Sequence, residues 1–215
     1  MADHPIHGLR REFRHHRLLE SEVPKDPLDL FRLWFDDAMR TSQPDPNALV
    51  LATADAAGRP SCRIVLLKGF DAHGFVFFTN YDSRKGVELA ANPYASMCFW
   101  WGELERQVRV EGPVGRVSAA ESDAYFRSRP RESQLGAAVS AQSRVIADRA
   151  VLENRLEQLT QRFEGMNVPR PVNWGGYRLC PEALEFWCGR EHRLHDRLRY
   201  ELDGANGWRM LRLAP

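Results

Sequence analysis

The sequence predicts a mainly β protein with flanking helices, of the α+β class, whose antiparallel strands form a barrel. Strand patterns follow one another closely between residues 48 and 117 and are joined mostly by short turns. Helical patterns lie mainly before this block and between about 118 and 164. Closely spaced strands favour a barrel over a parallel α/β sheet, in which strands alternate with helices.

Local signals indicate where the elements begin. Asp26-Pro27 has the residue types of a helix N-cap and first helical position, so a helix is expected over 27–40. A short helix should begin at Ser83, the capping box Ser118-Ala119-Ala120-Glu121 opens another, and a longer one is expected at about 147–164. Alternating or apolar runs predict strands at residues 48–54, 60–68, 75–79, 94–101, 106–117, 176–179, 184–187, 195–200 and 208–213.

Composition is that of an ordinary globular protein. Its 215 residues suffice for one domain, with 43% hydrophobic and 27% charged residues. A formal net charge of +1 does not indicate a nucleic-acid-binding protein. The four cysteines form no C-x-x-C pair, which argues against a zinc site and favours free thiols in a reducing cytoplasm. Apolar runs are too short for a membrane span and the N-terminus does not resemble a secretory signal, so we expect a cytoplasmic protein.

Two regions are expected. Residues 1–25 are polar and basic, and composition alone predicts a mobile, solvated tail. Residues 26–215 are expected to form a single domain with helical insertions at about 118–164. No internal repeat or low-complexity stretch divides this domain.

Familiar catalytic motifs do not occur in the sequence. It has no G-x-G-x-x-G, no Walker loop, no H-E-x-x-H and no G-x-S-x-G. Nicotinamide binding by a Rossmann fold and metalloprotease chemistry therefore have no support, and no metal site is expected. The remaining candidates are basic and hydroxyl side chains at the ends of elements.

Two basic groups could meet an anion. Ser83-Arg84-Lys85-Gly86 follows a strand and starts a helix, where backbone N–H groups and two cations would hold a phosphate; plain surface charge is the alternative. Arg63 and Lys68 bracket an apolar strand, so each must reach solvent or meet an anion. Alternation puts them on opposite faces of that strand.

Two further groups carry hydrogen-bond donors. Tyr125, Arg129 and Ser133 lie four apart around a helix end, and their hydroxyl and guanidinium groups would suit a phosphate monoester. Gln142-Ser143 offers neutral donors of the kind that bind carbonyl-rich rings. A solvated surface is the alternative for both groups.

The segment Arg193-Leu194-His195-Asp196-Arg197 is the sharpest candidate. If it is extended, Arg193, His195 and Arg197 project from one face. Three potentially cationic groups repel one another unless something negative or π-rich lies opposite, and an aromatic phosphorylated ligand would meet both conditions. A solvated edge strand is the alternative.

These segments share an order and a spacing with a known family over residues 9–215. The matching stretches are Leu9-Arg10-Arg11-Glu12, Arg63-Ile64-Val65-Leu66-Leu67-Lys68, Phe78-Thr79-Asn80, Ser83-Arg84-Lys85, Leu104-Glu105-Arg106-Gln107-Val108, Tyr125-Phe126, Ser128-Arg129-Pro130-Arg131, Ser133-Gln134, Gln142-Ser143, Glu185-Phe186-Trp187, Arg193-Leu194-His195-Asp196-Arg197 and Arg212-Leu213-Ala214-Pro215. Together they resemble the pyridoxamine 5′-phosphate oxidase family.

The resemblance implies a fold and a reaction. The fold is an FMN-binding split β-barrel that works as a homodimer, with flavin in clefts between the subunits. The family oxidises pyridoxamine or pyridoxine 5′-phosphate to pyridoxal 5′-phosphate, with O2 as electron acceptor and H2O2 as product. Such a flavin carries the redox step while the protein orients and shields the reactants.

The resemblance also implies residue roles. The flavin-binding set comprises Arg63, Ile64, Val65, Leu66, Leu67, Lys68, Phe78, Thr79, Arg84, Lys85, Gln107, Gln142, Ser143, Trp187 and Arg197. The clamp on the substrate phosphate comprises Lys68, Tyr125, Arg129 and Ser133. Arg193, Leu194 and His195 belong to the substrate site: Arg193 would cover the pyridine ring and orient its C4′ toward the flavin, and His195 would assist binding or protonation. The N-terminal Arg10, Arg11, Glu12 and Phe13 would close over the site as a lid, which replaces the tail expected from composition.

Three positions depart from the commoner family pattern. Phe13 and Phe78 stand where tyrosine is frequent, and Cys188 stands where glutamine is frequent. The missing phenol hydroxyls affect a lid hydrogen bond and one flavin contact. None of the three is a charged anchor, so activity is still expected.

Two other functions stay open. One is a related flavin oxidase acting on another reduced ring, such as a phenazine precursor, for which the phosphate clamp would be unnecessary. The other is a non-enzymatic protein that binds flavin or pyridoxal phosphate. Neither alternative requires a change in the expected fold.

Overall fold

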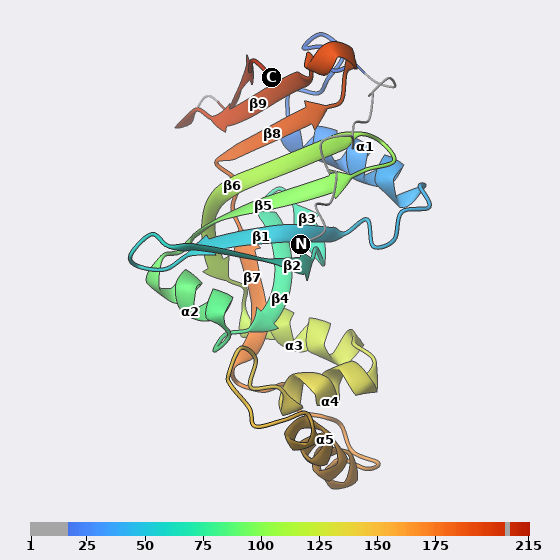
Figure 1. The fold of residues 1–215 in the computed structure, drawn as a ribbon, viewed down its shortest axis with the longest axis vertical. Coiled ribbons are helices and arrows are strands. Elements are labelled where there is room, and N and C mark those ends of the chain that lie inside the picture. Colours follow the sequence, from blue (N-terminus) through green and yellow to red (C-terminus); the bar gives the residue numbers. More distant parts are fainter. Residues whose placement is uncertain (1–16, 205–206) are drawn as a thin grey trace, which may run out of the picture. The chain divides into compact units, whose positions relative to one another are not determined.

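The computed structural model describes residues 17–204 and 207–215, and its contacts divide the chain into two compact units (Figure 1). Unit 1 is formed by the chain up to Ala48 with Cys98–Val110 and Glu182–Pro215. Unit 2 is formed by Leu49–Met97 and Glu111–Pro181. The strands β5 (Tyr94–Trp101) and β6 (Arg106–Arg116) contribute residues to both units.

Unit 1 combines one helix with antiparallel strands. It contains α1 (Pro27–Met39), β8 (Ala183–Cys188), β9 (Asp196–Leu202) and β10 (Trp208–Arg212), and β9 pairs antiparallel with both β8 and β10. The helix begins as predicted, because the Asp26 carboxylate accepts a hydrogen bond from the backbone N–H of Leu28 at 2.8 Å. Its buried face presents aromatic rings to the strands, with Phe31 against Phe99 and Trp34 against Phe186.

Unit 2 contains the remaining strands and helices. The strands are β1 (Ala48–Ala54), β2 (Pro60–Leu66), β3 (Gly69–Asp71), β4 (Gly74–Asn80) and β7 (Trp174–Leu179), and β4 pairs antiparallel with β3 and β7. The helices are α2 (Arg84–Ala91), α3 (Ala119–Ser128), α4 (Arg131–Val139) and α5 (Ala150–Arg162). Phe126 of α3, Leu135 of α4 and Trp174 of β7 share one hydrophobic cluster, to which Leu159 and Phe163 of the α5 region attach. The three helices α3, α4 and α5 follow one another at one end of unit 2 (Figure 1).

The predicted class is confirmed, since antiparallel strands dominate the described residues and helices flank them. Ser118 caps α3 as expected, accepting a hydrogen bond from the backbone N–H of Glu121 at 3.1 Å. Burial alternates along β2, which confirms that Arg63 and its neighbours Cys62 and Ile64 face opposite sides. The short strand β3 and the helix α4 were not predicted.

The strand predicted at 195–200 is confirmed as β9, but the extended conformation that a shared face of residues 193–197 requires is not present. Glu191–Arg193 forms a short 3-10 turn rather than a strand, and β9 begins only at Asp196. His192 and Arg193 both have left-handed backbone conformations, with φ of 55° and 62°. The strand alternation that would put Arg193 on the face of Arg197 therefore does not apply.

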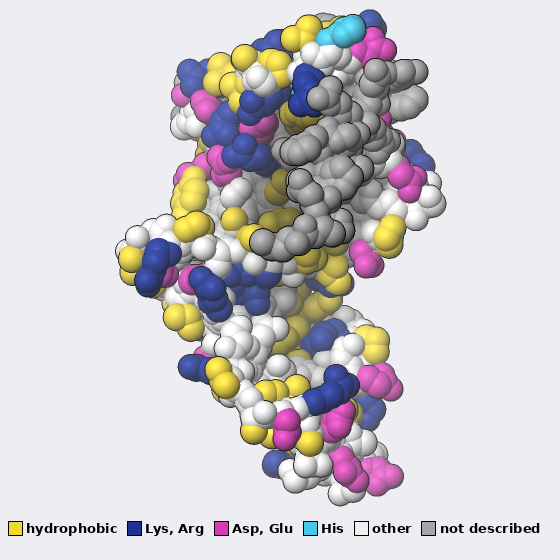
Figure 2. Space-filling model, viewed as in Figure 1, with side chains coloured by type: hydrophobic (Ala, Val, Ile, Leu, Met, Phe, Trp, Pro, Cys, Tyr) yellow, Lys and Arg dark blue, Asp and Glu magenta, His cyan; other side chains and the backbone are white. Residues whose placement is uncertain are grey.

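Positive and negative side chains are interspersed over the described part of the face in Figure 2, as the small net charge suggests. No helix within residues 17–204 and 207–215 has the length and apolar character needed to cross a membrane.

Candidate active site

A cavity of about 590 Å³ lies within unit 2. Strand β2, the end of β4, the start of α2 and the α3–α4 region supply most of its walls. The lining residues are Ile64, Val65, Leu66, Lys68, Phe78, Thr79, Asn80, Lys85, Tyr125, Arg129, Pro130, Ser133, Gly136, Ala137, Ser140, Gln142 and Trp174. The structure thus collects eleven predicted site residues, which lie up to 78 positions apart in the sequence, around one cavity.

The predicted phosphate clamp is brought together in this cavity. Tyr125 comes from α3, Ser133 comes from α4, and Arg129 is the residue that ends α3. The three side chains therefore come from two consecutive helices and from the break between them. Lys68, which follows β2, lies in the same lining.

Arg129 has a hydrogen-bond donor that no described residue uses. Its Nη1 is buried and has no hydrogen-bond partner among the described residues. Its guanidinium lies over the ring of Trp174, 4.8 Å from the ring centroid, which holds the side chain in place without neutralising it. Burial lowers the pKa of Arg129 from its ordinary value. A buried guanidinium N–H without an acceptor is costly unless a ligand supplies one.

Aromatic rings form the wall beside Arg129. Tyr125 stacks on Phe78 with their ring centroids 3.9 Å apart, and Phe78 also stacks on Trp174 at 5.6 Å. Phe78 stands where the family commonly has tyrosine, and its ring fills this stack. The wall needs only a flat apolar face at this position, which phenylalanine supplies.

Lys85 provides a second cation in the cavity. Its Nζ donates to Thr79 Oγ1 at 3.1 Å, to Ser83 Oγ at 3.2 Å and to Gln142 Oε1 at 2.9 Å, all of them neutral acceptors. Burial lowers the pKa of Lys85 to about 8, with a further decrease from Arg63. The group is still mainly protonated at pH 7, so the cavity holds a buried positive charge next to the start of α2.

The start of α2 is built by its cap. Ser83 Oγ accepts from the backbone N–H of Gly86 at 3.4 Å and donates to the carbonyl oxygen of Asn80 at 2.7 Å. Gly86 allows the helix to approach the strand end, because a Cβ there would overlap the carbonyl oxygen of Tyr81. These contacts place the positive end of the helix beside Lys85.

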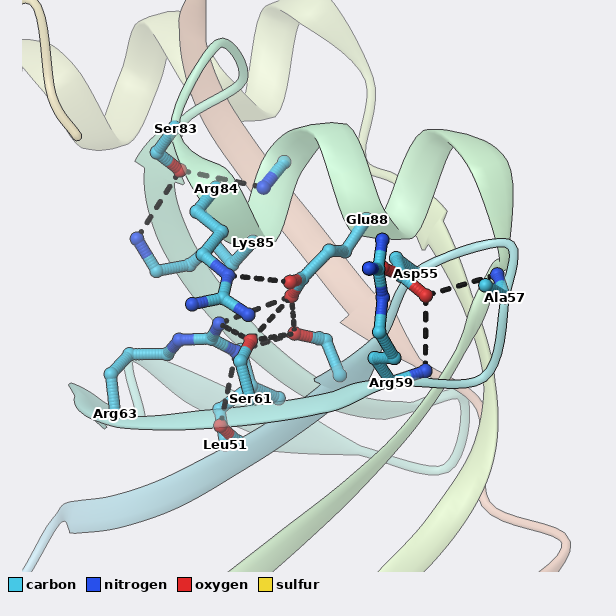
Figure 3. Close-up of polar contacts among 12 residues, drawn as sticks. Leu51, Asp55, Ala57, Arg59, Ser61, Arg63, Ser83, Arg84, Lys85 and Glu88 are labelled. Atoms are coloured by element: carbon cyan, nitrogen blue, oxygen red, sulfur yellow. Dashed lines mark hydrogen bonds and ion pairs between the residues drawn. The ribbon is translucent and has the colours of Figure 1, made fainter. Parts of the chain in front are cut away.

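Arg84 is the first residue of this helix, and Arg63 lies on β2. Neither lines the cavity. Both hydrogen-bond to the buried carboxylate of Glu88, Arg63 through Nη2 at 3.2 Å and Arg84 through Nε at 2.8 Å (Figure 3). Sequence reasoning missed Glu88. Its signal was a glutamate four residues after Arg84 on a helix, a spacing that puts both side chains on one face.

Six of the predicted residues, on β6, on β8 and near the C-terminus, belong to unit 1. Gln107 lies on β6 and Trp187 on β8, while Arg193, Leu194 and His195 lie in or after the 3-10 turn. The His195 and Trp187 rings are 4.6 Å apart. The backbone N–H of Arg190 donates to His195 Nδ1 at 3.0 Å, so the neutral ring carries its proton on Nε2.

Burial, and then the charge of Arg193, lower the pKa of His195 from its ordinary value. Arg197, the last predicted residue of unit 1, donates from Nε to buried Glu185 at 2.8 Å and from Nη1 to the carbonyl oxygen of Ala214 at 2.8 Å. Burial raises the pKa of Cys188 to about 11, so this departure from glutamine leaves a protonated thiol.

Two predicted residues of unit 2, Leu67 and Ser143, do not line the cavity either. Leu67 is buried, and Ser143 adopts a left-handed conformation with φ of 70°. Arg10, Arg11, Glu12 and Phe13 lie outside the described residues. Sequence reasoning did not assign Ala137 and Ser140 to the site, because the helix α4 was not recognised. It also missed Trp174, which begins β7 two residues before the strand predicted at 176–179.

The donor set fits a phosphorylated, flat ligand such as FMN. Buried Lys85 and partly buried Arg129 line the same cavity as an aromatic wall; Lys85 Nζ donates to neutral acceptors, and Arg129 Nη1 has no partner among the described residues. Residues 17–204 and 207–215 contain no group of three His, Cys, Asp or Glu side chains that could hold a metal ion. The arrangement can bind anions and planar rings but offers no activated nucleophile of its own.

Solved structures share this fold. An FMN-binding protein from Nostoc punctiforme, related to pyridoxamine 5′-phosphate oxidase, superposes with a TM-score of 0.68 at 17% identity and covers 90% of this chain and 98% of its own. PhzG from Burkholderia lata, solved with tetrahydrophenazine-1-carboxylic acid, superposes with a TM-score of 0.86 at 33% identity, covering 93% of this chain and 98% of its own. The fold is thus that of the split-barrel flavoproteins.

Sequence comparisons narrow the class to a family. The model of pyridoxamine 5′-phosphate oxidase matches residues 35–163, and that of the pyridoxine 5′-phosphate oxidase C-terminal dimerisation region matches residues 174–215. A pyridoxine/pyridoxamine 5′-phosphate oxidase from Rubrobacter xylanophilus is 57% identical over 100% of this chain and 98% of its own length. Another from Acaryochloris marina is 53% identical over 98% of this chain and 95% of its own.

The chain belongs to the pyridoxamine 5′-phosphate oxidase family. It is an oxidoreductase, and its cofactor is FMN.

Proposed function

We propose that the chain oxidises pyridoxine and pyridoxamine 5′-phosphate to pyridoxal 5′-phosphate, with FMN as cofactor and O2 as electron acceptor. The observation that carries this proposal is the buried, partnerless Nη1 of Arg129 in the same cavity as Lys85. Two separate cations suit two phosphates, one on the cofactor and one on the substrate.

The cavity residues divide between these two ligands. Lys85, Thr79 and Gln142 hold the flavin side, because they form one hydrogen-bonded group at the start of α2. Arg129, with Tyr125, Ser133 and Lys68, clamps the phosphate of the substrate. The apolar side chains of β2, among them Ile64 and Leu66, present an exposed surface on which a ring can lie.

FMN, when bound, would supply the redox chemistry, accepting a hydride from the substrate C4′ carbon and returning the electrons to O2, which would give H2O2. With pyridoxamine 5′-phosphate, water would hydrolyse the imine formed at C4′ and ammonia would leave. The protein binds, orients and shields the reactants. Arg193 covers the pyridine ring and directs C4′ toward the flavin. His195, neutral and protonated on Nε2, donates a hydrogen bond to the substrate.

Assembly and location complete the proposal. The C-terminal dimerisation region is part of the chain, and we infer a homodimer with flavin between the subunits. In that arrangement Trp187, Arg197 and Gln107 add flavin contacts, and Arg10–Phe13 closes over the substrate. Cys62, Cys98, Cys180 and Cys188 are free thiols, which suits a reducing cytoplasm.

PhzG is a reason to keep a second candidate, because it shares the fold at 33% identity and was solved with a reduced phenazine. A phenazine precursor has no phosphate, so the buried guanidinium of Arg129 would remain without an acceptor. The phosphate clamp therefore favours the phosphorylated pyridine.

The test measures H2O2 and aldehyde formed under air by the purified, FMN-loaded protein. Pyridoxine 5′-phosphate is compared with unphosphorylated pyridoxine and with a tetrahydrophenazine carboxylate. We expect turnover of the phosphorylated pyridine alone. Neither peroxide nor aldehyde from a flavin-loaded preparation would refute the oxidase, and turnover of the phenazine instead would support the second candidate.

A further inference from the structure

Glu88 of α2 is a buried carboxylate that accepts hydrogen bonds only from side chains. Its Oε2 accepts from Thr53 Oγ1 at 2.5 Å, from Ser61 Oγ at 2.6 Å and from Arg63 Nη2 at 3.2 Å, and its Oε1 accepts from Arg84 Nε at 2.8 Å (Figure 3). Burial alone would raise the pKa of Glu88, but these hydrogen bonds outweigh it and lower the pKa to about 2. The carboxylate therefore stays ionised inside unit 2.

Arg63 hydrogen-bonds to this carboxylate and does not line the cavity. Its Nη1 donates to the carbonyl oxygen of Leu51 and to Thr53 Oγ1, and its Nη2 donates to Ser61 Oγ and to Glu88. Four acceptors match the four N–H bonds of the two Nη groups. Each hydroxyl that accepts from Arg63 also donates to Glu88, so the pair is linked directly and through both hydroxyls.

Arg84 has the complementary arrangement. Its Nε donates to Glu88 Oε1, and neither of its Nη groups has a hydrogen-bond acceptor within the described chain. The side chain is 63% exposed, so the Nη groups are accessible. A guanidinium held through Nε keeps the Nη1–Nη2 side as a fork that can bind two oxygens of one phosphate.

The charges add up to a site for a dianion. Arg63, Arg84 and Lys85 bring three positive charges, and Glu88 brings one negative charge, which leaves an excess of two. A phosphate monoester carries about −1.5 to −2 at pH 7. The charge of Glu88 also raises the pKa of Lys85, opposing the effects of burial and of Arg63. Glu88 thereby helps to keep Lys85 protonated.

We propose that Glu88 is a positioning residue for the flavin phosphate, holding the Arg84 fork toward the anion that Lys85 also binds and neutralising Arg63. This inference rests on the proposed function, since it assumes that the start of α2 receives the phosphate of FMN. Glutamine in place of Glu88 cannot preserve these contacts, because its NH2 group would point at hydrogen-bond donors and cannot accept from them.

The test compares the affinities of FMN and riboflavin, which differ only in the phosphate, by quenching of flavin fluorescence in the full chain. For Glu88→Gln we expect FMN to bind about tenfold more weakly, the effect of one charge-assisted contact, with riboflavin affinity unchanged. Equal losses for both flavins, or FMN binding as tight as in the wild type, would overturn the proposal.

Three further variants sharpen the test. Arg84→Gln should reproduce the loss of FMN affinity, and the Glu88→Gln/Arg84→Gln double variant should lose little more; additive losses would contradict action through Arg84. Arg84→Lys keeps the positive charge but not the two Nη groups, so it should also lose preference for FMN over riboflavin. This variant tests the proposal even if Glu88→Gln does not fold. The matched control is Glu121→Gln, which removes a carboxylate paired with Arg178 elsewhere in unit 2 and should leave both affinities unchanged.

The flavin preference of the wild type distinguishes failure of the phosphate site at α2 from failure of the role of Glu88. If the wild type binds FMN no better than riboflavin, the proposed phosphate site at α2 fails. If the wild type prefers FMN and Glu88→Gln keeps that preference, only the role of Glu88 fails.

Discussion

Arg129 is the residue on which substrate recognition depends. Arg129→Gln removes the cation but keeps a polar side chain, so the KM for pyridoxine 5′-phosphate should rise by about tenfold or more while FMN stays bound. Steady-state kinetics under air measure this change. The control is Arg127→Gln, an exposed position on the same helix. An unchanged KM in the Arg129 variant would remove this residue from the phosphate clamp.

Arg193 is expected to act on turnover rather than on the cofactor. It lies in the 3-10 turn of unit 1 with a left-handed φ of 62°, a conformation that costs energy for a side chain other than glycine and recurs at functional sites. Arg193→Ala should therefore lower kcat/KM strongly and leave the flavin content of the purified protein unchanged. An equal loss of bound FMN would instead place Arg193 among the flavin ligands.

His195 gives the reaction a predictable pH dependence. Since burial and Arg193 lower the pKa of His195 below its ordinary value of 6.5, the ring is neutral at pH 7 and gains a proton only in more acidic solution. The acidic limb of kcat/KM should therefore have its midpoint below pH 6.5, and Arg193→Gln should move it upward. A His195 midpoint above 6.5, measured by NMR on the ring protons, would contradict this.

At the scale of elements, the start of α2 positions the flavin side of the cavity. Gly86→Ala would force a Cβ against the carbonyl oxygen of Tyr81, so the helix must shift away from the strand end. We expect weaker FMN binding and a lower unfolding temperature. Gly115→Ala on β6 is the matched control, because a Cβ there meets no neighbour within 4 Å and the residue does not line the cavity. Equal behaviour of the two variants would mean that the close approach at Gly86 is unimportant.

The elements also show which local signals suffice. α1, α2 and α3 were predicted because Asp26, Ser83 and Ser118 each accept a backbone hydrogen bond at the helix start, and such caps are contained in a few consecutive residues. α4 follows Pro130 without a side-chain cap, so it lacked this signal. α5 has no side-chain cap either, but it was predicted from its helical spacing over a longer segment. The short α4, which carries Ser133 of the predicted phosphate clamp, was recognised by neither signal.

At the scale of the whole molecule, cofactor and assembly should be linked. The protein is expected to sediment as a dimer, with twice the chain mass of 24.7 kDa, because the dimerisation region is present. FMN should raise the unfolding temperature in a concentration-dependent way, and riboflavin should raise it less. Analytical ultracentrifugation and thermal unfolding with each flavin measure the two effects. A monomer that binds FMN tightly would contradict the proposed flavin site between subunits.

The sequence by itself determined the class of fold, most element positions and the family, because strand alternation, helix caps and the order of motifs are local properties of the chain. It also identified the cations at 68, 85 and 129. Only the tertiary structure decided which of them share a cavity. Whether a cation meets an internal carboxylate depends on side chains distant in sequence, as Arg63 meets Glu88 and Arg197 meets Glu185.

The segment 193–197 illustrates the same division. Its composition indicated a substrate site, but the assumption of an extended strand was wrong, since backbone conformation there follows a 3-10 turn with two left-handed residues. Alternation predicts a shared face only where the chain is extended. Arg193 lies in that turn and His195 directly precedes β9, so strand alternation does not relate their side chains.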